Sequence, residues 1–156
     1  MGSDEFVSSR AWLSELFETH ALEIRERQLI VLREFDARFL VAPSGALEAA
    51  LRGLFDFAVA TTPDHCEIYL ATARTTRPVA ELGSGSLTMR WQVVGERLRL
   101  VDAPTVALRP IPGDPADHVR SKRASALTRA FDDAGWRFEL SVVSRKGELL
   151  ARAWHD

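Results

Sequence analysis

Apolar positions recur along this chain with two different periods, and the period indicates where helices and strands lie. The clearest helical pattern covers residues 47–63, LEAALRGLFDFAVATTP. One face of this stretch collects apolar side chains at helical spacing: Leu47, Leu51, Leu54 and Ala58. Ser44 precedes it as a helix cap, and Pro63 ends it because proline cannot continue the hydrogen-bond ladder. The sequence therefore predicts an amphipathic helix here.

Two further helices are predicted, one on each side of this stretch. The first is capped by Ser8 or Ser9 and runs to about Arg27. Its inward face consists of Trp12, Leu13, Leu16, Phe17, His20 and Ile24. The second covers about residues 119–134, and its inward face consists of Ala126, Leu127, Ala130 and Phe131. We interpret His20 as a packing histidine, because no second histidine stands at ligand spacing.

Stretches in which apolar and polar residues alternate predict strands. They cover residues 29–34, 38–42, 66–74, 87–94, 97–101, 136–144 and 148–154. We expect the first two to be joined by a tight turn near Asp36, and the last two to form a hairpin around residues 145–147. Gly95 and Glu96 predict a turn into residues 97–101. The buried face of the central strands should contain Cys66, Ile68, Leu70, Ala73, Leu87, Met89, Trp91 and Val93.

Two loops complete the predicted architecture. Residues 75–86 contain a Gly-Ser-Gly-Ser run, which we interpret as a flexible connector because the lysine of a phosphate-binding P-loop is missing. Prolines exclude regular structure from residues 104–118. The resulting order of elements predicts an α+β fold, a two-layer sandwich with helices on one face of a mixed sheet. Residues 7–156 should form a single domain, preceded by a disordered N-terminus or a cloning remnant at residues 1–6.

Composition and charge narrow the functional classes. At 156 residues, 46% hydrophobic and 27% charged, the chain suits one globular domain. Its formal net charge of −2 gives no electrostatic footprint for nucleic acid or an anionic membrane. The one cysteine, Cys66, cannot form an internal disulfide, and no apolar run has transmembrane length. We therefore expect a cytoplasmic protein that binds neither nucleic acid nor membranes.

Residues that could support catalysis or bind a metal are few and scattered. Cys66 beside His65 is a candidate nucleophile, although an inert core cysteine is the simpler interpretation. The acid–histidine neighbours Asp64-His65 and His155-Asp156 should diverge in space because they are adjacent in sequence. We interpret three further charged groups as solvent-exposed surface: Glu48, Asp56 and the basic run at residues 120–123. The sequence thus predicts no catalytic residue and no metal site.

The helix at residues 47–63 resembles the first helix of the ATP-binding domain of sensor histidine kinases, which are Bergerat-fold (GHKL) ATPases. In that family the helix typically reads L-x-N-L-L-x-N-A-x-x-x-T-P. This chain keeps its frame with Leu51, Leu54, Phe55, Ala58, Thr62 and Pro63. Near the C-terminus, the last hairpin of the family is similar to Gly135, Phe138, Leu140 and Gly147. The resemblance extends from about Val7 to the C-terminus and implies the family's fold.

The same resemblance places unsuitable residues where the family binds ATP and Mg²⁺. Gly53 and Phe57 replace its two asparagines, the second of which holds the magnesium. Val93 replaces the adenine-reading aspartate of its D-x-G-x-G motif, in which Gly95 survives and Arg97 occupies the second glycine position. Phenyl and valine side chains carry no lone pair for a cation or an adenine amino group. We expect very weak or absent ATP binding, no cofactor, and a former pocket filled by side chains.

The resemblance thus implies a scaffold without catalysis. The family's phosphate-binding turn should precede residue 119, yet residues 116–118 contain no glycine. The leading hypothesis is a degenerate histidine-kinase-like ATPase domain, a pseudokinase that acts in two-component signalling through protein interaction. Its partner would be a phosphotransfer helical hairpin, a receiver domain or a second copy in a homodimer, with Trp136 or Trp154 as an interface anchor if exposed. The alternatives are a functional ATP-binding domain with rearranged ligands, which an open polar pocket would favour, and an unrelated α+β binding domain.

Overall fold

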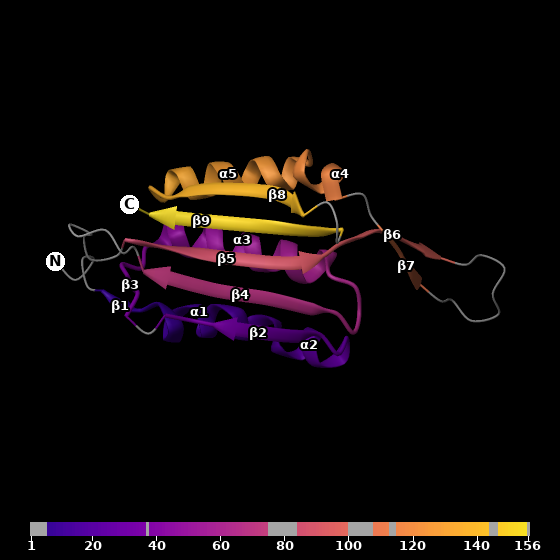
Figure 1. Cartoon of the computed structure of the whole chain (residues 1–156), viewed down its shortest axis with the longest axis horizontal. Helices are drawn as coiled ribbons and strands as arrows, with labels where there is room; N and C mark the ends of the chain where they lie inside the picture. Colours follow the sequence, from indigo (N-terminus) through magenta and orange to yellow (C-terminus); the bar gives the residue numbers. More distant parts are fainter. Residues whose placement is uncertain are drawn as a thin grey trace.

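Five strands form the central sheet of the molecule. The computed structural model describes residues 6–36, 38–74, 84–99, 108–112, 115–143 and 147–155. The strand order is β2 (Ile30–Glu34), β4 (Glu67–Arg74), β5 (Gly85–Gln92), β9 (Glu148–His155) and β8 (Arg137–Val143). β2 runs parallel to β4, and the other neighbouring pairs are antiparallel. The sheet is therefore mixed, and its last two strands form the predicted C-terminal hairpin (Figure 1).

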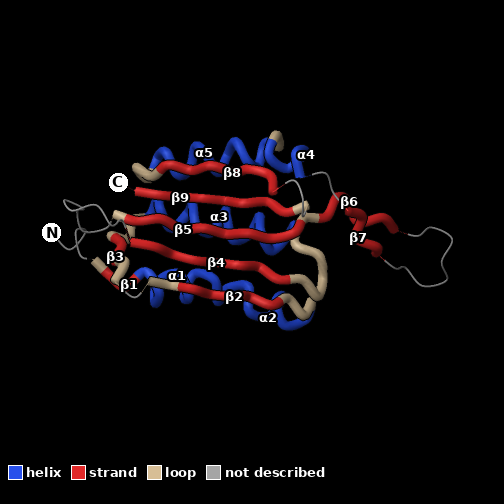
Figure 2. Tube along the Cα trace, viewed as in Figure 1, coloured by secondary structure: helices blue, strands red, loops and turns tan. Residues whose placement is uncertain are grey.

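Helices cover one face of this sheet. They are α1 (Ser9–Phe17), α2 (Ala21–Glu26), α3 (Gly45–Thr61), α4 (Pro115–Val119) and α5 (Lys122–Asp133). Figure 2 shows them behind the strands, with α1 at the β2 edge of the sheet, α5 at the β8 edge and α3 between them. The largest fully buried side chains, Trp91, Phe17, Phe39, Phe55, Phe57 and Phe131, belong to the core of the molecule. This arrangement confirms the predicted two-layer α+β sandwich.

The predicted central helix is α3. The Ser44 hydroxyl oxygen accepts a hydrogen bond from the Leu47 amide at 3.1 Å, as expected for an N-cap. At the other end, the Arg27 side chain donates hydrogen bonds to the carbonyl oxygens of Val59, at 2.7 Å, and Thr62. These bonds occupy carbonyl groups at the end of α3, where a helix lacks partners of its own. A residue distant in sequence therefore completes the end of this helix.

The predicted N-terminal helix is interrupted. Ser8 caps α1, with its Oγ 3.5 Å from the Ala11 amide nitrogen, but a 3-10 turn, η1 (Glu18–His20), separates α1 from α2. The Thr19 hydroxyl donates a hydrogen bond to the Leu16 carbonyl at 3.1 Å. Threonine hydroxyls that bond to nearby carbonyl groups compete with the helix ladder and often bend helices. The prediction of one continuous helix to Arg27 was therefore wrong.

The tight turn predicted near Asp36 does not join a pair of neighbouring strands. β3 (Leu40–Val41) pairs antiparallel with β1 (Val7–Ser8) and not with β2. Asp36 accepts hydrogen bonds from the backbone amides of Arg38, at 2.9 Å, and Arg74, at 3.2 Å. These amides lower the pKa of Asp36 because they stabilise its carboxylate form. The bond to Arg74 links the chain after β2 to the end of β4.

The segment after β5 is more regular than predicted. The strand expected from residue 97 is present up to Arg99 as part of β6 (Val94–Arg99), which pairs antiparallel with β7 (Leu108–Pro112). The strand already begins at Val94, where a turn at Gly95 and Glu96 was expected. An irregularity in register lies between Val94 and Arg97. Figure 1 shows this pair beyond one end of the main sheet. The described part of the proline-rich stretch 104–118 thus contains β7 and most of α4, although proline was expected to exclude both.

A few side chains also face differently from the prediction. Leu87, Met89, Trp91 and Val93 are buried as expected, but Thr72 is buried in β4 while Ala73 is exposed. In α5, Ala124 is buried and Ala126 is exposed. Gly85 begins β5 and is no flexible connector. A Cβ atom placed on it would lie 2.7 Å from both the Ala73 carbonyl oxygen and the Phe39 ring.

Candidate functional site

The candidate site lies where α3, α5 and the end of β5 meet. Gly53 and Phe57 are four residues apart on α3, and Val93 directly follows β5. A Cβ atom placed on Gly53 would lie 3.2 Å from Cδ2 of Leu127, which is closer than an ordinary van der Waals contact. Glycine at position 53 therefore allows α3 to pack closely against Leu127 of α5. One turn further along α3, the space between the two helices is the candidate site.

The Phe57 side chain occupies that space. It is 1% exposed, and its ring lies edge-on to the indole of Trp91, with centroids 6.0 Å apart, and to the imidazole of His118, with centroids 6.1 Å apart. The Arg123 guanidinium lies 5.3 Å from the centre of the same ring. Side chains from β5, α4 and α5 thus converge on an apolar ring from α3. The sequence suggested that Phe57 would fill this position, but not which residues would enclose it.

The polar groups next to Phe57 are bonded to one another. Trp91 Nε1 donates a hydrogen bond to Thr61 Oγ1 at 2.8 Å, and Thr61 Oγ1 donates to the Phe57 carbonyl oxygen at 2.7 Å. In the described part of the chain, the buried side-chain oxygen that lacks a hydrogen bond is Ser9 Oγ, at the start of α1. The described part of the candidate site therefore has no buried polar side chain left unsatisfied for a ligand.

The remaining nucleotide-site positions are described less completely. Val93 is 6% exposed and belongs to the hydrophobic core. Gly95 and Arg97 lie in β6, where the structure describes the backbone pairing and the side-chain surroundings lie outside the described part. Residues 116–118, where the family's phosphate-binding turn was expected, belong to α4. The structure thus brings Gly53 and Phe57 to one seam and puts a short helix beside them.

The other candidate catalytic residues do not form a site. Cys66 is half-buried just before β4, and its Sγ lies 3.7 Å from Oε1 of Gln92. The Asp64 carboxylate accepts a hydrogen bond from Arg27 Nε at 2.8 Å. The His155 ring packs on Trp136, and Asp156 lies outside the described residues. No group of three or more acidic, histidine or cysteine side chains in the described ranges could hold a metal ion.

One acid–histidine pair was missed by sequence reasoning. His20 Nε2 lies 2.9 Å from Oδ1 of Asp56, and the Phe17 ring lies beside the imidazole. The pair links η1 to α3. Its two residues are 36 positions apart in the sequence, so a local sequence pattern could not have predicted the contact. Asp56 was interpreted as solvated surface, and this contact shows that it has a partner. The pair joins two elements of the helical layer.

The two candidate interface tryptophans differ in exposure. Trp136 is 9% exposed, and its ring centroid lies 6.3 Å from that of Phe39 and 5.7 Å from that of His155. It therefore offers no exposed anchor. Trp154 is half-buried, and the Arg152 guanidinium lies 5.1 Å from its ring centre. Between the two, Trp154 remains the candidate contact residue.

Known proteins resemble this chain in fold but not detectably in sequence. No family model matches the chain, and no curated protein matches it by sequence. Solved structures do match: the catalytic domain of histidine kinase ThkA superposes with a TM-score of 0.66 at 10% identity over 97% of this chain and 94% of that one. Histidine kinase AdeS of Acinetobacter baumannii gives 0.66 at 9% identity over 97% and 66% of the two chains. The mycobacterial sensor histidine kinase MprB gives 0.56 at 14% identity over 97% of both.

The fold is that of histidine kinase catalytic domains. The α+β architecture, predicted from the periodicity of apolar residues and matched by the family resemblance, is therefore confirmed. In this histidine-kinase fold the candidate site is the α3–α5 seam that Phe57 fills. None of the described helices has the length and apolar character needed to cross a membrane.

Proposed function

We propose that this chain is a catalytically degenerate histidine-kinase-type ATPase domain that has lost ATP and Mg²⁺ binding and works as an interaction or regulatory module. The observation that carries the proposal is the enclosure of Phe57 by Trp91, His118 and Arg123. Under the resemblance, this is the position from which the family holds magnesium. Magnesium requires oxygen ligands in octahedral geometry, and a buried phenyl ring provides none.

Energetic considerations support loss of binding. A nucleotide entering this seam would have to displace a fully buried phenylalanine, and removing such a ring from a core typically costs about 3–5 kcal/mol. Each phosphate or adenine group left without a partner would cost a further ~1–3 kcal/mol. The Trp91 indole N–H and the Thr61 hydroxyl next to Phe57 already donate their hydrogen bonds within the protein. Both costs would reduce the free energy of nucleotide binding, so we expect the affinity for ATP to be very low.

The alternative is a functional ATP-binding domain with rearranged ligands. One observation favours it: the Arg123 guanidinium and the His118 ring lie beside Phe57, so cationic and polar groups are close to the seam. If the Phe57 ring rotated outward, Arg123 could approach a phosphate. The two functions then differ in one measurable property, magnesium-dependent nucleotide binding.

Calorimetry and thermal melting with millimolar ATP, with and without Mg²⁺, test the proposal. A nucleotide held at 100 times its dissociation constant would stabilise the fold by ~2.7 kcal/mol, so binding would raise the melting temperature clearly. We expect neither heat nor a shift, in contrast to an ATP-binding histidine kinase catalytic domain run in parallel. Magnesium-dependent stabilisation of the unmodified chain would overturn the proposal in favour of the alternative.

A Phe57→Asn variant sharpens this experiment. Restoring the family's residue opens the seam and supplies an amide oxygen, so partial magnesium-dependent binding by the variant would assign the loss to this position. Phe57→Ala is the matched control, because it opens the seam without an oxygen ligand. Binding by both variants would mean that Phe57 blocks the site sterically. Binding by neither would mean that other positions, such as Val93, also contribute to the loss.

For the interaction role we propose a protein partner: a phosphotransfer helical hairpin, a receiver domain or a second copy of the chain. Trp154 is the candidate contact, since it is half-buried while Trp136 is enclosed in the core. Sedimentation velocity tests the homodimer, and titration with a purified hairpin or receiver domain tests the others. A Trp154→Ala variant should weaken whichever association is found. An association that Trp154→Ala leaves unchanged would exclude this surface.

A further inference from the structure

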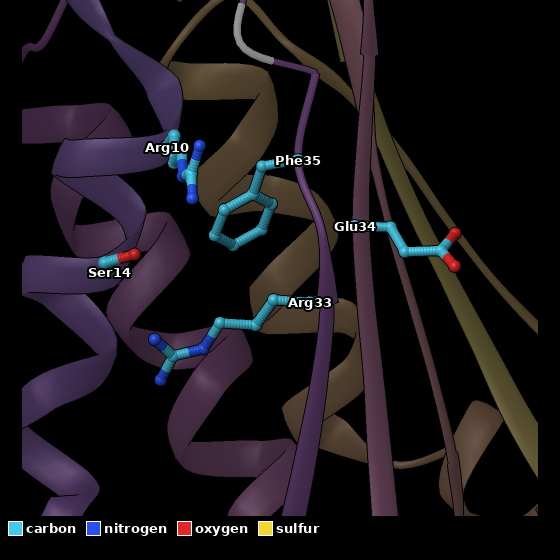
Figure 3. A pocket seen from close by; sticks show the side chains of 5 residues that line it. All are labelled: Arg10, Ser14, Arg33, Glu34 and Phe35. Atoms are coloured by element: carbon cyan, nitrogen blue, oxygen red, sulfur yellow. The ribbon is translucent and has the colours of Figure 1, made fainter.

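A hollow of about 370 Å³ lies at the opposite end of the helical layer, between α1 and β2. It is lined by Arg10 and Ser14 of α1, Arg33 and Glu34 of β2, and Phe35. Figure 3 shows the two arginine side chains, the serine hydroxyl and the Phe35 ring directed into the space between helix and strand. The hollow therefore combines two cations, a hydroxyl group and an apolar wall.

The one acidic side chain of the lining points away from the hollow. In Figure 3 Glu34 extends to the other side of the strand. There its Oε2 accepts a hydrogen bond from the Tyr69 hydroxyl at 2.6 Å. Alternation of side chains along β2 explains the difference, since neighbouring residues of a strand face opposite sides of the sheet. Glu34 thus does not neutralise the arginines next to it in space.

Neither arginine has a carboxylate partner among the described residues. The ion pairs found there involve the arginines at 27, 52 and 90 and the histidine at 20. The Phe17 ring positions the Arg33 side chain, whose guanidinium lies 5.9 Å from the ring centre. A planar guanidinium held over an aromatic ring keeps its N–H groups available at its edge. Within the described part of the chain, the hollow therefore carries positive charge that no carboxylate pairs with.

We propose that this hollow binds a phosphoryl group. A phosphomonoester carries a charge of about −1.5 to −2 at neutral pH, which two guanidinium groups balance, and its oxygens accept both their N–H bonds and a serine hydroxyl bond. The Phe35 ring offers apolar contact to the group that carries the phosphate. The hollow lies at the edge of the sheet formed by β2 and α1, whereas the Phe57 seam lies between α3 and α5, toward the opposite edge (Figure 1). Phosphoryl binding at the hollow therefore does not depend on whether the seam binds a nucleotide.

Two sources share this chemistry: a phosphorylated small molecule and a phosphorylated protein side chain. Titration of the full chain followed by amide NMR distinguishes them with three probes: inorganic phosphate, free phosphoserine and a short phosphoserine peptide. All three should shift amides of residues 10–14 and 33–35. Tighter binding of the peptide than of free phosphoserine would assign the site to a protein partner, and equal binding to a small molecule. No shift with any probe at about 10 mM, ten times a 1 mM dissociation constant, would overturn the proposal.

Variants separate a specific site from general attraction of anions. Arg10→Gln and Arg33→Gln should each weaken phosphate binding about tenfold, the effect of losing one charge-assisted contact. Arg33→Lys should lie between, because it keeps the charge and loses the planar fork. Arg25→Gln on α2 is the matched control, since Arg25 is exposed and lies outside the hollow. Equal weakening by Arg25→Gln would overturn the proposal. Circular dichroism confirms that each variant is folded.

Discussion

Arginine and phenylalanine side chains lie together in two regions of the helical layer, but one region is closely packed and the other encloses a hollow. Between α3 and α5, Arg123 lies against the ring of Phe57, which is 1% exposed, and the seam is closed. Between α1 and β2, Arg10 and Arg33 border a hollow beside the half-buried Phe35. The position of Phe57 is thus packed, and the position between α1 and β2 is open. A shared fold therefore does not by itself show where a ligand would bind.

Replacing Phe57 tests the closed seam and should have the largest effect. Phe57→Ala removes a fully buried ring and leaves a cavity, so it should lower the free energy of unfolding by about 3–5 kcal/mol. Phe35→Ala at the open hollow should cost about 1 kcal/mol, because that ring is half-buried. Urea denaturation of both variants measures the difference. Equal losses would contradict the contrast between a packed and an open end.

The arginines offer a second comparison. Arg27 bonds to Glu23, to Asp64 and to two carbonyl oxygens at the end of α3, and its side chain is 15% exposed. Arg27→Ala should cost about 2–3 kcal/mol because it removes the bonds to the part-buried carbonyl oxygens at the end of α3 together with two ion pairs. Arg33→Ala should cost less than about 1 kcal/mol, since it loses one ring contact at an exposed position. Denaturant midpoints at constant slope check both values. A large loss for Arg33→Ala would indicate a structural role in place of a binding role.

Asp36, next to Phe35 in sequence, makes the open end sensitive to acid. The backbone amides of Arg38 and Arg74 lower the pKa of Asp36 in the folded state. Its contribution to stability is therefore present above the unfolded pKa, about 3.9, and is lost as the pH falls through the lower folded value. Unfolding curves between neutral pH and pH 2 should show a steeper acid loss for the wild type than for Asp36→Asn. Parallel curves would exclude this contribution.

The smallest effect concerns Tyr69, which donates a hydrogen bond to Glu34 on the side of β2 away from the hollow. The hydrogen bond to Glu34 raises the pKa of Tyr69, because the bond is made by the protonated hydroxyl. Tyr69 is the one tyrosine of the chain, so tyrosinate absorbance reports it alone. Its midpoint should lie above the ordinary value of about 10, and Glu34→Gln should lower it. An unchanged midpoint in that variant would show that Glu34 is not held by Tyr69 in solution.

Much of the fold could be predicted because its signals are local. The helical spacing of apolar residues up to Pro63 defined α3, and strict alternation defined β5 with Met89 and Trp91 buried. The failures have both long-range and local causes. Asp36 bonds to Arg74 across 38 positions, and β3 pairs with β1 and not with β2. The β6–β7 pair was missed because a strand partner is not visible in the local pattern. The interruption of the N-terminal helix is local, since the Thr19 hydroxyl bonds to the Leu16 carbonyl three positions earlier.

The sequence by itself determined that position 57 carries no oxygen ligand, because this follows from the identity of Phe57 alone. Tertiary structure decided what surrounds that side chain: β5, α4 and α5 place Trp91, His118 and Arg123 around the ring. It also decided that Arg10 and Arg33, separated by 23 positions, meet beside one hollow while Glu34 turns to the opposite face. Residue chemistry is local, but the assembly of a site depends on packing between elements that no local period encodes.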